Sequence, residues 1–432
     1  MHAGFHTADI TPPLGVNLSG HFIMRPANEV HDPLQATAVV LDDGRSMAAL
    51  IATDLVGVEA DLVAETRELV AAQTGIPQGA VMIWGTHTHA GPVLTSHGWH
   101  PGDEQTRRLL PRQLAGCVAA AAGRMQPLSI RHASGYEDRI AFNRRYRMRD
   151  GSMTTNPGVG NPAVAAVDGP IDPEVGVLFF DGENGPLGAI VNHGCHLDVL
   201  GNSNFQYSAD FPWAMREALG AVYGDEFTAV FANGPCGNIN HINVFGRKRQ
   251  GGFDHCRMMG RTLAGEVMKV DYSAAPVTAE PLWWRSETLE LRLREFTEAE
   301  IAEFRRILED PDLQAKQISS GNFERGRAER ALAMVEAGIT TRDVEVQVIG
   351  LGEVALVAVP CEYFVEFGLQ IKAQSAAPIT LVIELANGYF GYVPTAEALA
   401  EGGYEGSSAK FSPEAGQMLA DAALGMIRSG VV

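Results

Sequence analysis

Strand-forming and helix-forming segments alternate along this 432-residue chain, and neighbouring strands are joined by short turns. Residues 35–41 and 47–53 are apolar and flank Asp42-Asp43-Gly44, a turn typical of a β-hairpin. Residues 58–74 have a helical pattern, as do residues 255–270. Because hairpins supply antiparallel strand pairs and the helices between them must cover a sheet, the sequence predicts an α/β fold with mixed sheets flanked by helices.

The composition is that of a globular protein, with 46% hydrophobic and 20% charged residues. The net charge of −19 disfavours nucleic acid and anionic membrane surfaces as partners. No apolar run reaches the length of a transmembrane helix, and the first residues lack the basic and apolar segments of a secretion signal. The five cysteines are widely spaced, which suits reduced thiols. We therefore expect a cytoplasmic protein without stable membrane insertion, and the oligomeric state, including a homo-oligomer, stays open.

Two stretches bear on how the chain is organised. We expect residues 1–432 to form one domain, with residues 272–280 as a connector at which it could divide. Residues 141–173 are rich in Gly, Pro and Asn and contain the basic run Asn143-Arg144-Arg145-Tyr146-Arg147. A long irregular insert of this kind is either a functional loop or a surface excursion with solvated arginines, and the sequence leaves both interpretations open.

A pair of histidines follows the apolar segment 81–84. In Thr86-His87-Thr88-His89 they are two residues apart, so in a continuing strand their side chains would share one face. Neutral imidazoles in this position can hold a metal ion. The alternative is a pair of hydrogen-bonded histidines at a sheet edge, because two ligands do not make a metal site by themselves.

Other polar clusters also follow apolar, strand-like segments, and functional sites gather where loops leave strand ends. These clusters are His193–Asp198, Asn233–Asn240, Glu362 and Tyr389–Tyr392. Their recurrence favours one functional site to which they contribute together.

An ordered set of motifs runs nearly from end to end of the chain. It comprises Ala8-Asp9-Ile10-Thr11-Pro12, Thr86-His87-Thr88-His89-Ala90-Gly91-Pro92, Cys195-His196, Ser208-Ala209-Asp210, Gly234-Pro235-Cys236-Gly237-Asn238, Pro360-Cys361-Glu362, Tyr392-Val393-Pro394-Thr395 and Tyr404-Glu405-Gly406. The set resembles the N-terminal catalytic domain of the neutral/alkaline ceramidases, the non-lysosomal zinc amidases. Tyr392 and Tyr404 have the same spacing as that family's two active-site tyrosines.

The resemblance implies a zinc ion bound by His87, His196, Glu362 and Tyr392. Zinc lowers the pKa of a bound water towards neutrality and polarises a carbonyl group. By the same resemblance, His89 stabilises the oxyanion or moves a proton, and Tyr404 hydrogen-bonds the scissile amide. The implied activity is zinc-dependent hydrolysis of a carbon–nitrogen amide bond in an N-acyl compound.

The chain also departs from the family. Cys236 stands where the ceramidases have a serine, and it could be a hydrogen-bond partner, a space filler or the nucleophile of a thiol hydrolase. We also expect no C-terminal immunoglobulin-like domain, because the chain ends soon after its last predicted helix. With the missing secretion signal, this favours a small soluble amide over membrane-embedded ceramide.

Several positive and aromatic side chains of the chain could bind such a substrate. Arg144 and Arg145, with Asn238, are the candidates for contacting it, and the arginines could pair with a carboxylate or phosphate. Trp84 and Trp99, with His97 and His100, could wall the cleft. Three rival functions stay open: a ceramidase acting on N-acylsphingosine, a thiol hydrolase using Cys236, and a non-catalytic zinc-containing binding protein.

Overall fold

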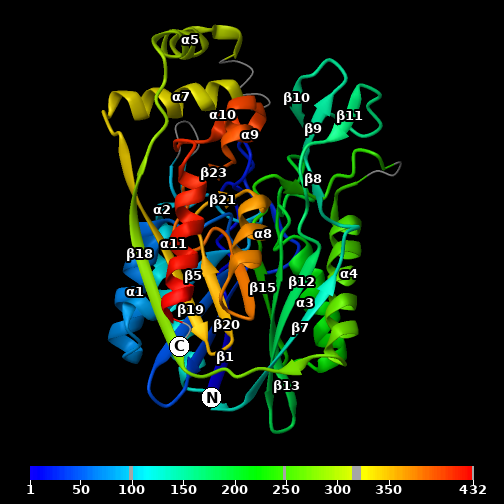
Figure 1. The fold of residues 1–432 in the computed structure, drawn as a ribbon, viewed down its shortest axis with the longest axis vertical. Coiled ribbons are helices and arrows are strands. Elements are labelled where there is room, and N and C mark those ends of the chain that lie inside the picture. Colours follow the sequence, from blue (N-terminus) through cyan, green and yellow to red (C-terminus); the bar gives the residue numbers. More distant parts are fainter. Residues whose placement is uncertain (97–100, 247–249, 314–322, 431–432) are drawn as a thin grey trace.

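The computed structural model describes residues 1–96, 101–246, 250–313 and 323–430. Within these ranges, three sheets have four or five strands each, and helices pack on them (Figure 1). Parallel and antiparallel neighbours occur in all three sheets. The predicted α/β class with mixed sheets and flanking helices is therefore confirmed.

The first sheet contains the predicted hairpin. Its strand order is β5 (Val81–Gly85), β4 (Met47–Thr53), β3 (Gln35–Asp42), β1 (His2–Asp9) and β6 (Gln126–Pro127). In the turn between β3 and β4, the Asp43 carboxylate accepts the backbone N–H groups of Arg45 and Ser46. Helix α1 (Ala60–Thr74) connects β4 to the parallel strand β5, and α2 (Glu104–Ala122) packs on β1 and β3.

The second sheet follows the same plan. Its order is β15 (Thr228–Asn233), β13 (Gly185–His193), β12 (Glu174–Gly182), β7 (Ser129–Tyr136) and β17 (Ala275–Pro276). Helices α3 (Phe211–Tyr223) and α4 (Phe253–Asp271) pack against each other, α3 on β15 and α4 on β7 and β12. The expected connector at residues 272–280 supplies edge strand β17, and a division of the chain there stays a prediction.

The third sheet comes from the C-terminal part of the chain. Its order is β18 (Leu282–Arg292), β19 (Thr341–Leu351), β20 (Val354–Ala358) and β22 (Ile379–Ile383). Helix α8 (Val365–Gln374) packs on β22, and α11 (Ala415–Gly430) packs on β18 and β19. Helices α5 (Glu298–Glu309), α7 (Phe323–Glu336), α9 (Ala396–Glu401) and α10 (Gly403–Ser408) gather at the upper end of the molecule in Figure 1.

Residues 141–173 are not the irregular insert that the sequence predicts. They form β8 (Phe142–Asn143), β9 (Arg145–Met148), β10 (Met153–Thr155) and β11 (Val164–Val167), with a small sheet of order β10-β9-β11. Tyr146 and Val164 are buried together with Val244, so this excursion has an apolar cluster of its own. That burial explains why a segment rich in Gly and Pro is ordered.

The three larger sheets meet at the carboxyl ends of β5, β15 and β22. Asn233, at the end of β15, donates through Nδ2 to the carbonyl oxygen of Thr86 just after β5, at 3.2 Å. It also accepts the N–H of Glu384, just after β22, at 3.0 Å. One hydrophobic core contains residues of all three sheets, including Ile83, Val230 and Ile383. The loops that leave these strands are therefore held side by side.

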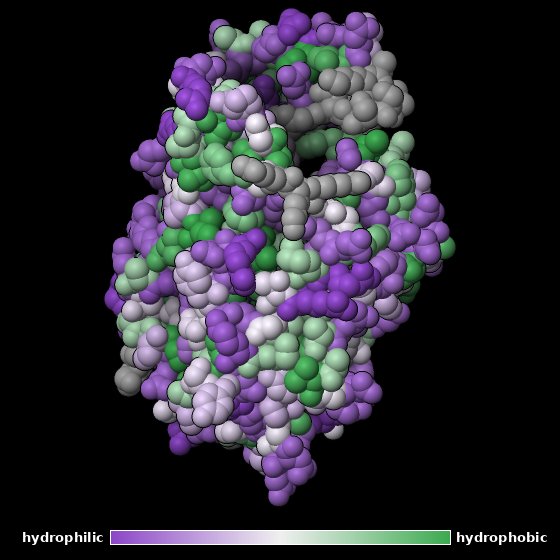
Figure 2. Space-filling model, turned by 90° about the vertical axis from the view of Figure 1, so that its right-hand side faces the viewer, coloured by the Kyte–Doolittle hydropathy of each residue, from purple (hydrophilic) through white to green (hydrophobic). Residues whose placement is uncertain are grey.

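The surface is largely polar on the side drawn in space-filling form. On the face shown in Figure 2, hydrophilic side chains predominate and apolar ones are scattered between them. Among the described residues, no helix is both long enough and apolar enough to span a membrane.

Candidate active site

His87 and His89 lie in the loop directly after β5, and not within the strand. His87 has a φ of 80°, a left-handed conformation that residues other than glycine seldom adopt. The prediction that strand alternation aligns the two rings is therefore wrong, because the strand ends at Gly85. The turn still brings the rings together, with their Nε2 atoms 3.4 Å apart.

Three further side chains converge on His87. His196 follows β13, and Glu362 and Tyr392 face each other on the short parallel strands β21 (Glu362–Tyr363) and β23 (Tyr392–Val393). Glu362 Oε2 lies 3.6 Å from His87 Nε2 and 3.2 Å from His196 Nε2. The Tyr392 hydroxyl lies 3.2 Å from the same His196 nitrogen. The predicted ligand set is thus brought together in one buried cluster.

The hydrogen bonds of the two rings indicate which nitrogen carries the proton. His87 Nδ1 lies 2.7 Å from the carbonyl oxygen of Val56, and His196 Nδ1 lies 2.8 Å from that of Cys236. A carbonyl oxygen only accepts, so both Nδ1 atoms are donors and the neutral rings have lone pairs on Nε2. Burial and the charge of Arg144 lower the pKa of His196 to about 3, which keeps that ring neutral.

These side chains fit a metal ion. Two Nε2 lone pairs face one carboxylate oxygen, so three hydrogen-bond acceptors lie together. The Tyr392 hydroxyl has a single hydrogen and can satisfy one of them. A cation between the groups would satisfy all of them, and nitrogen and oxygen ligands of this kind suit zinc. The backbone carbonyls that hold both Nδ1 atoms are the usual outer partners of histidine ligands. His89 belongs to the same compact group, because its ligand nitrogen lies within 4.8 Å of those of His87 and His196.

His21 and Asp198 were missed by the sequence interpretation. Asp198 Oδ1 lies 2.8 Å from His21 Nε2 and 3.6 Å from His89 Nδ1. Burial alone would raise the pKa of Asp198, but the neighbouring His89 and His21 lower it below its ordinary value. Asp198 belongs to the polar cluster His193–Asp198 that follows β13, so its position after a strand pointed to a place in the site. His21 gave none, because it is 177 residues away in the sequence.

Tyr404 lies beside Tyr392, with ring centroids 5.5 Å apart. The guanidinium of Arg144 lies over both rings, 5.4 Å from the centroid of Tyr392 and 5.7 Å from that of Tyr404. Its Nε donates to Glu405 at 2.8 Å, and its Nη2 donates to the carbonyl oxygen of Gly237 at 2.7 Å. Arg144 is therefore a buried support for the tyrosines, which corrects its expected role as a contact for an acidic substrate.

Arg145 and Asn238 are also occupied by the protein itself. Arg145 is 1% exposed and forms ion pairs with Asp168, Glu401 and Glu405. Asn238 is buried, where it donates to the Glu366 carboxylate and accepts the N–H of Val365. Neither side chain offers a free polar group for the substrate contact that the sequence suggested.

Cys236 is buried beside His196 Nδ1, on the opposite side of that ring from Nε2. Its Sγ lies 3.3 Å from His196 Nδ1 and donates to Glu384 Oε1 at 2.8 Å. Burial and the Glu384 carboxyl raise the pKa of the thiol well above its ordinary value. A buried, protonated thiol is a poor nucleophile, so this placement disfavours the thiol-hydrolase alternative.

The aromatic wall that we expected is only partly described. Trp84 is a core residue whose Nε1 donates to the carbonyl oxygen of Phe231 at 3.0 Å, so it does not line a cleft. Trp99, His97 and His100 lie outside the described residues.

A cavity of about 490 Å³ opens onto the cluster. Glu362, Tyr392 and Tyr404 form part of its wall, and Phe22 and Leu94 supply apolar surface. Tyr389, also in the wall, donates to Glu362 Oε1 at 3.1 Å, which leaves Oε2 directed at the histidines. The cavity therefore gives a small molecule access to the candidate metal site.

The comparisons with known proteins agree with this geometry. No protein-family model matches the chain. The neutral ceramidase of Pseudomonas aeruginosa is 25% identical to it over 398 residues, an alignment covering 77% of this chain and 57% of that protein. The chain thus matches a little over half the length of this relative.

Solved structures share the fold. The crystal structure of the Pseudomonas aeruginosa neutral ceramidase matches all of this chain and 75% of that one, with a TM-score of 0.77 and 22% identity. A structure described as ceramidase complexed with C2 matches with a TM-score of 0.76 and 20% identity, over the same shares of the two chains. Sequence and fold both agree with the resemblance drawn from the motifs: the chain is similar to a neutral ceramidase in sequence and shares the fold of the solved ceramidase structures.

Proposed function

We propose that the protein is a zinc-dependent amidohydrolase that cleaves the amide bond of an N-acyl compound. The observation that carries this proposal is the convergence of two imidazole lone pairs on one carboxylate oxygen of Glu362, a residue that lines an accessible cavity. His87, His196, Glu362 and Tyr392 would hold the zinc ion. Zinc bound there would polarise the amide carbonyl and lower the pKa of a water molecule.

His89 is the candidate for moving the proton. Its Nε2 faces the ligand cluster, and its Nδ1 faces Asp198, as a general base and its orienting carboxylate do. His89 Nε2 would accept a proton from the attacking water and deliver it to the leaving amine nitrogen. Asp198 would stabilise the imidazolium between these two transfers.

Tyr404 and Arg144 would stabilise the charge that develops on the carbonyl oxygen. The Tyr404 side chain lines the cavity next to Tyr392, where its hydroxyl can donate to that oxygen. Arg144 lies under both rings and places a fixed positive charge beside them. Because Arg144 is held by Glu405 and Gly237, it needs no rearrangement during the reaction.

A second candidate function is hydrolysis of ceramide itself. It is favoured by the similarity to a neutral ceramidase, since ceramide is an N-acyl compound of the proposed class. The two candidates share the mechanism and differ only in substrate, so a substrate panel that includes ceramide in mixed micelles separates them.

The test combines metal analysis with hydrolysis assays. We expect about one zinc per chain, loss of activity with a chelator and recovery on adding zinc. His89→Ala should keep the zinc and lose hydrolysis, whereas His2→Ala, which removes an exposed histidine, should keep both. Activity that survives complete removal of the metal would support a thiol enzyme. Bound zinc without hydrolysis of any N-acyl compound in the panel would support a binding protein.

A further inference from the structure

Two positively charged side chains in the wall of the active-site cavity form no ion pair within the described part of the chain. Arg330 comes from α7, and Lys410 lies between α10 and α11. Both are half-buried, and neither makes a side-chain hydrogen bond or ion pair with any described residue. The residues outside the described ranges include no aspartate or glutamate. In a chain with a net charge of −19, two such cations in one cavity call for an explanation.

The carboxylates near these cations are already engaged. Glu329 pairs with Arg325 at 3.3 Å, and Glu59 accepts a hydrogen bond from Thr95 at 2.9 Å. Glu362 belongs to the metal cluster. The guanidinium of Arg330 lies over the aromatic ring of Phe22, at 5.3 Å from its centroid. The positive charges of Arg330 and Lys410 are therefore available to a ligand that enters the cavity.

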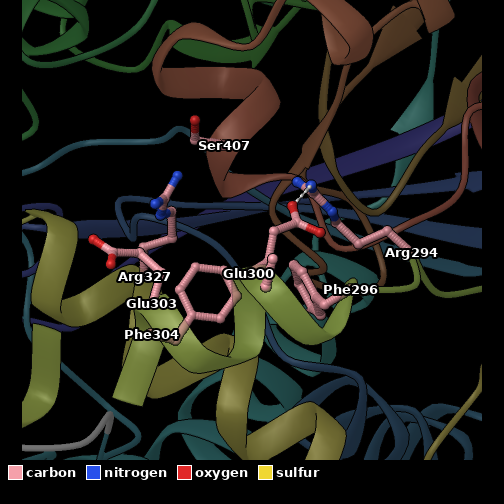
Figure 3. A pocket seen from close by; sticks show the side chains of 8 residues that line it. Arg294, Phe296, Glu300, Glu303, Phe304, Arg327 and Ser407 are labelled. Carbon is pink, nitrogen blue, oxygen red and sulfur yellow. Dashed lines mark hydrogen bonds and ion pairs between the residues drawn. The ribbon is translucent and has the colours of Figure 1, made fainter. Parts of the chain in front are cut away.

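A neighbouring pocket provides a contrast. It lies between α5, α7 and α10, with a volume of about 280 Å³ (Figure 3). There, Arg294 pairs with Glu300 at 3.4 Å, as the dashed line in Figure 3 marks, and the guanidinium of Arg327 lies 5.3 Å from the ring centroid of Phe304. In that pocket Glu300 thus forms an ion pair with Arg294, whereas no described carboxylate forms an ion pair with Arg330 or Lys410.

The ammonium group of Lys410 is close to the reacting centre. A Cβ atom on Gly391 would lie 3.9 Å from its Nζ, and the next residue is the candidate ligand Tyr392. A substrate whose amide reaches the metal cluster therefore has room for a second group beside Lys410. Pro92, Val93 and Leu94 line the same cavity and suit the apolar part of an acyl chain.

We propose that Lys410 and Arg330 bind an anionic group of the substrate, and that the enzyme hydrolyses acidic N-acyl compounds. The group is a carboxylate, as in an N-acyl amino acid, or a phosphate; an ammonium and a guanidinium bind either one. This inference rests on the proposed amide hydrolysis and adds the class of substrate. The expected contact with an anionic group is thus assigned to Lys410 and Arg330, which no sequence motif indicated, and no longer to Arg144 and Arg145.

The test compares substrates that share one acyl chain. An N-acylglycine carries the carboxylate, an N-acylethanolamine replaces it with a neutral hydroxymethyl group, and an N-acyl-O-phosphoethanolamine carries a phosphate. The wild type should favour an acidic compound over the neutral one by about ten-fold or more in kcat/KM. Whichever acidic compound is preferred identifies the anion.

The variants Lys410→Met and Arg330→Met should each reduce this preference, mainly by raising KM for the acidic compound. Lys410→Arg should retain most of it. Arg305→Met removes an exposed cation from α5 and should change nothing. Equal kcat/KM for the acidic and neutral compounds in the wild type would overturn the inference, and so would an acidic preference that survives in both methionine variants.

A binding measurement separates this inference from the proposed function. If no amide is hydrolysed, the proposed function fails, but calorimetry with the same acidic and neutral compounds still tests the two cations. Tighter binding of an acidic compound by the wild type, reduced in Lys410→Met and in Arg330→Met, would support the anion site. Equal or undetectable binding of both compounds would refute it.

Discussion

Arg144 and Arg145 beneath the site, and Arg330 and Lys410 in its wall, carry the same charge in opposite surroundings. The first two are buried and paired with carboxylates of the protein. The second two are half-buried, face a cavity and form no ion pair with a carboxylate of the described residues, because the carboxylates near them have other partners. The buried pair is therefore held by the protein, with Arg144 against the two tyrosines, whereas the cavity pair is left to bind a ligand.

The difference shows that a conspicuous basic run is a poor guide to a binding site. Arginine in a protein interior is tolerated only when its charge is paired and hydrogen-bonded, which uses up its capacity for a ligand. Burial alone would lower the pKa of Arg144, but Tyr392 and Glu405 raise it above its ordinary value, so the guanidinium stays charged. Substitutions made separately in the buried pair and in the cavity pair test whether the first has a structural role and the second a binding role.

The largest effect on the free energy of unfolding should come from a substitution in the buried arginine pair. Among the described residues, Arg144→Met leaves Glu405 with Arg145 and Thr155 as its side-chain partners, so we expect the free energy of unfolding to fall by about 3 kcal/mol. Urea unfolding measures this loss. Arg147→Met is the matched control from the same run, because the Arg147 side chain is 46% exposed and should change stability little. Adding Glu405→Gln should restore part of the loss, and a double variant less stable than Arg144→Met would contradict the argument.

Removing a candidate metal ligand should act on activity more than on folding. His87→Ala, His196→Ala and Glu362→Ala should each lose most of the zinc and more than about 100-fold in kcat/KM, since even outer partners of a metal ligand are worth 10–100-fold. Elemental analysis and the N-acyl assay measure both quantities. Stoichiometric zinc in two of these variants, with the fold intact, would exclude the ligand set.

The buried region should also respond to pH. Burial raises the pKa of Glu384 to about 8 from an ordinary value of 4.5, so the folded state keeps a proton that the unfolded state releases. The stability associated with this proton is complete below about pH 4.5 and is lost as the pH rises to about 8, by about 1.4 kcal/mol per pH unit. Glu384→Gln should remove this fall, because the amide oxygen can still accept the N–H groups of Cys236 and Tyr363. Equal slopes of stability against pH in wild type and variant would contradict the assignment.

Cys236 should matter less than its motif suggests. A serine hydroxyl can donate to Glu384 in place of the thiol, so Cys236→Ser should change stability by about 1 kcal/mol and retain measurable hydrolysis. The buried thiol should also resist iodoacetamide in the native protein. Mass spectrometry after alkylation checks this, and a thioester trapped on Cys236 during turnover would show that the nucleophile is the thiol.

The smallest effect on stability should come from the cavity cations. Lys410→Met and Arg330→Met remove charges that form no ion pair with a described carboxylate, so the free energy of unfolding should change by no more than about 0.5 kcal/mol. Thermal or urea unfolding provides the measurement. A loss as large as that of Arg144→Met would mean that these cations hold the fold together, and the contrast between the two regions would disappear.

Local patterns in the sequence predicted the fold class and the order of the candidate ligands. Hairpin turns such as Asp42-Asp43-Gly44 and the alternation of strands with helices act over a few residues, so they can be interpreted without the fold. His87, His196, Glu362 and Tyr392 were implied by the resemblance to the ceramidases, and the structure brings them into one cluster. Whether they bind zinc stays a prediction.

Only the tertiary structure decided which charges are paired and which are free. Arg144 meets Glu405 across 261 residues, and Asp198 meets His21 across 177. The loops that carry the site are held together where the three sheets join, and no local pattern encodes those distances. An arginine that pairs with a protein carboxylate, as Arg144 does with Glu405, has a structural role. Arg330 and Lys410 form no such pair with a described residue and face the cavity. The reason is that the cost of burying a charge depends on its neighbours in space and not in sequence.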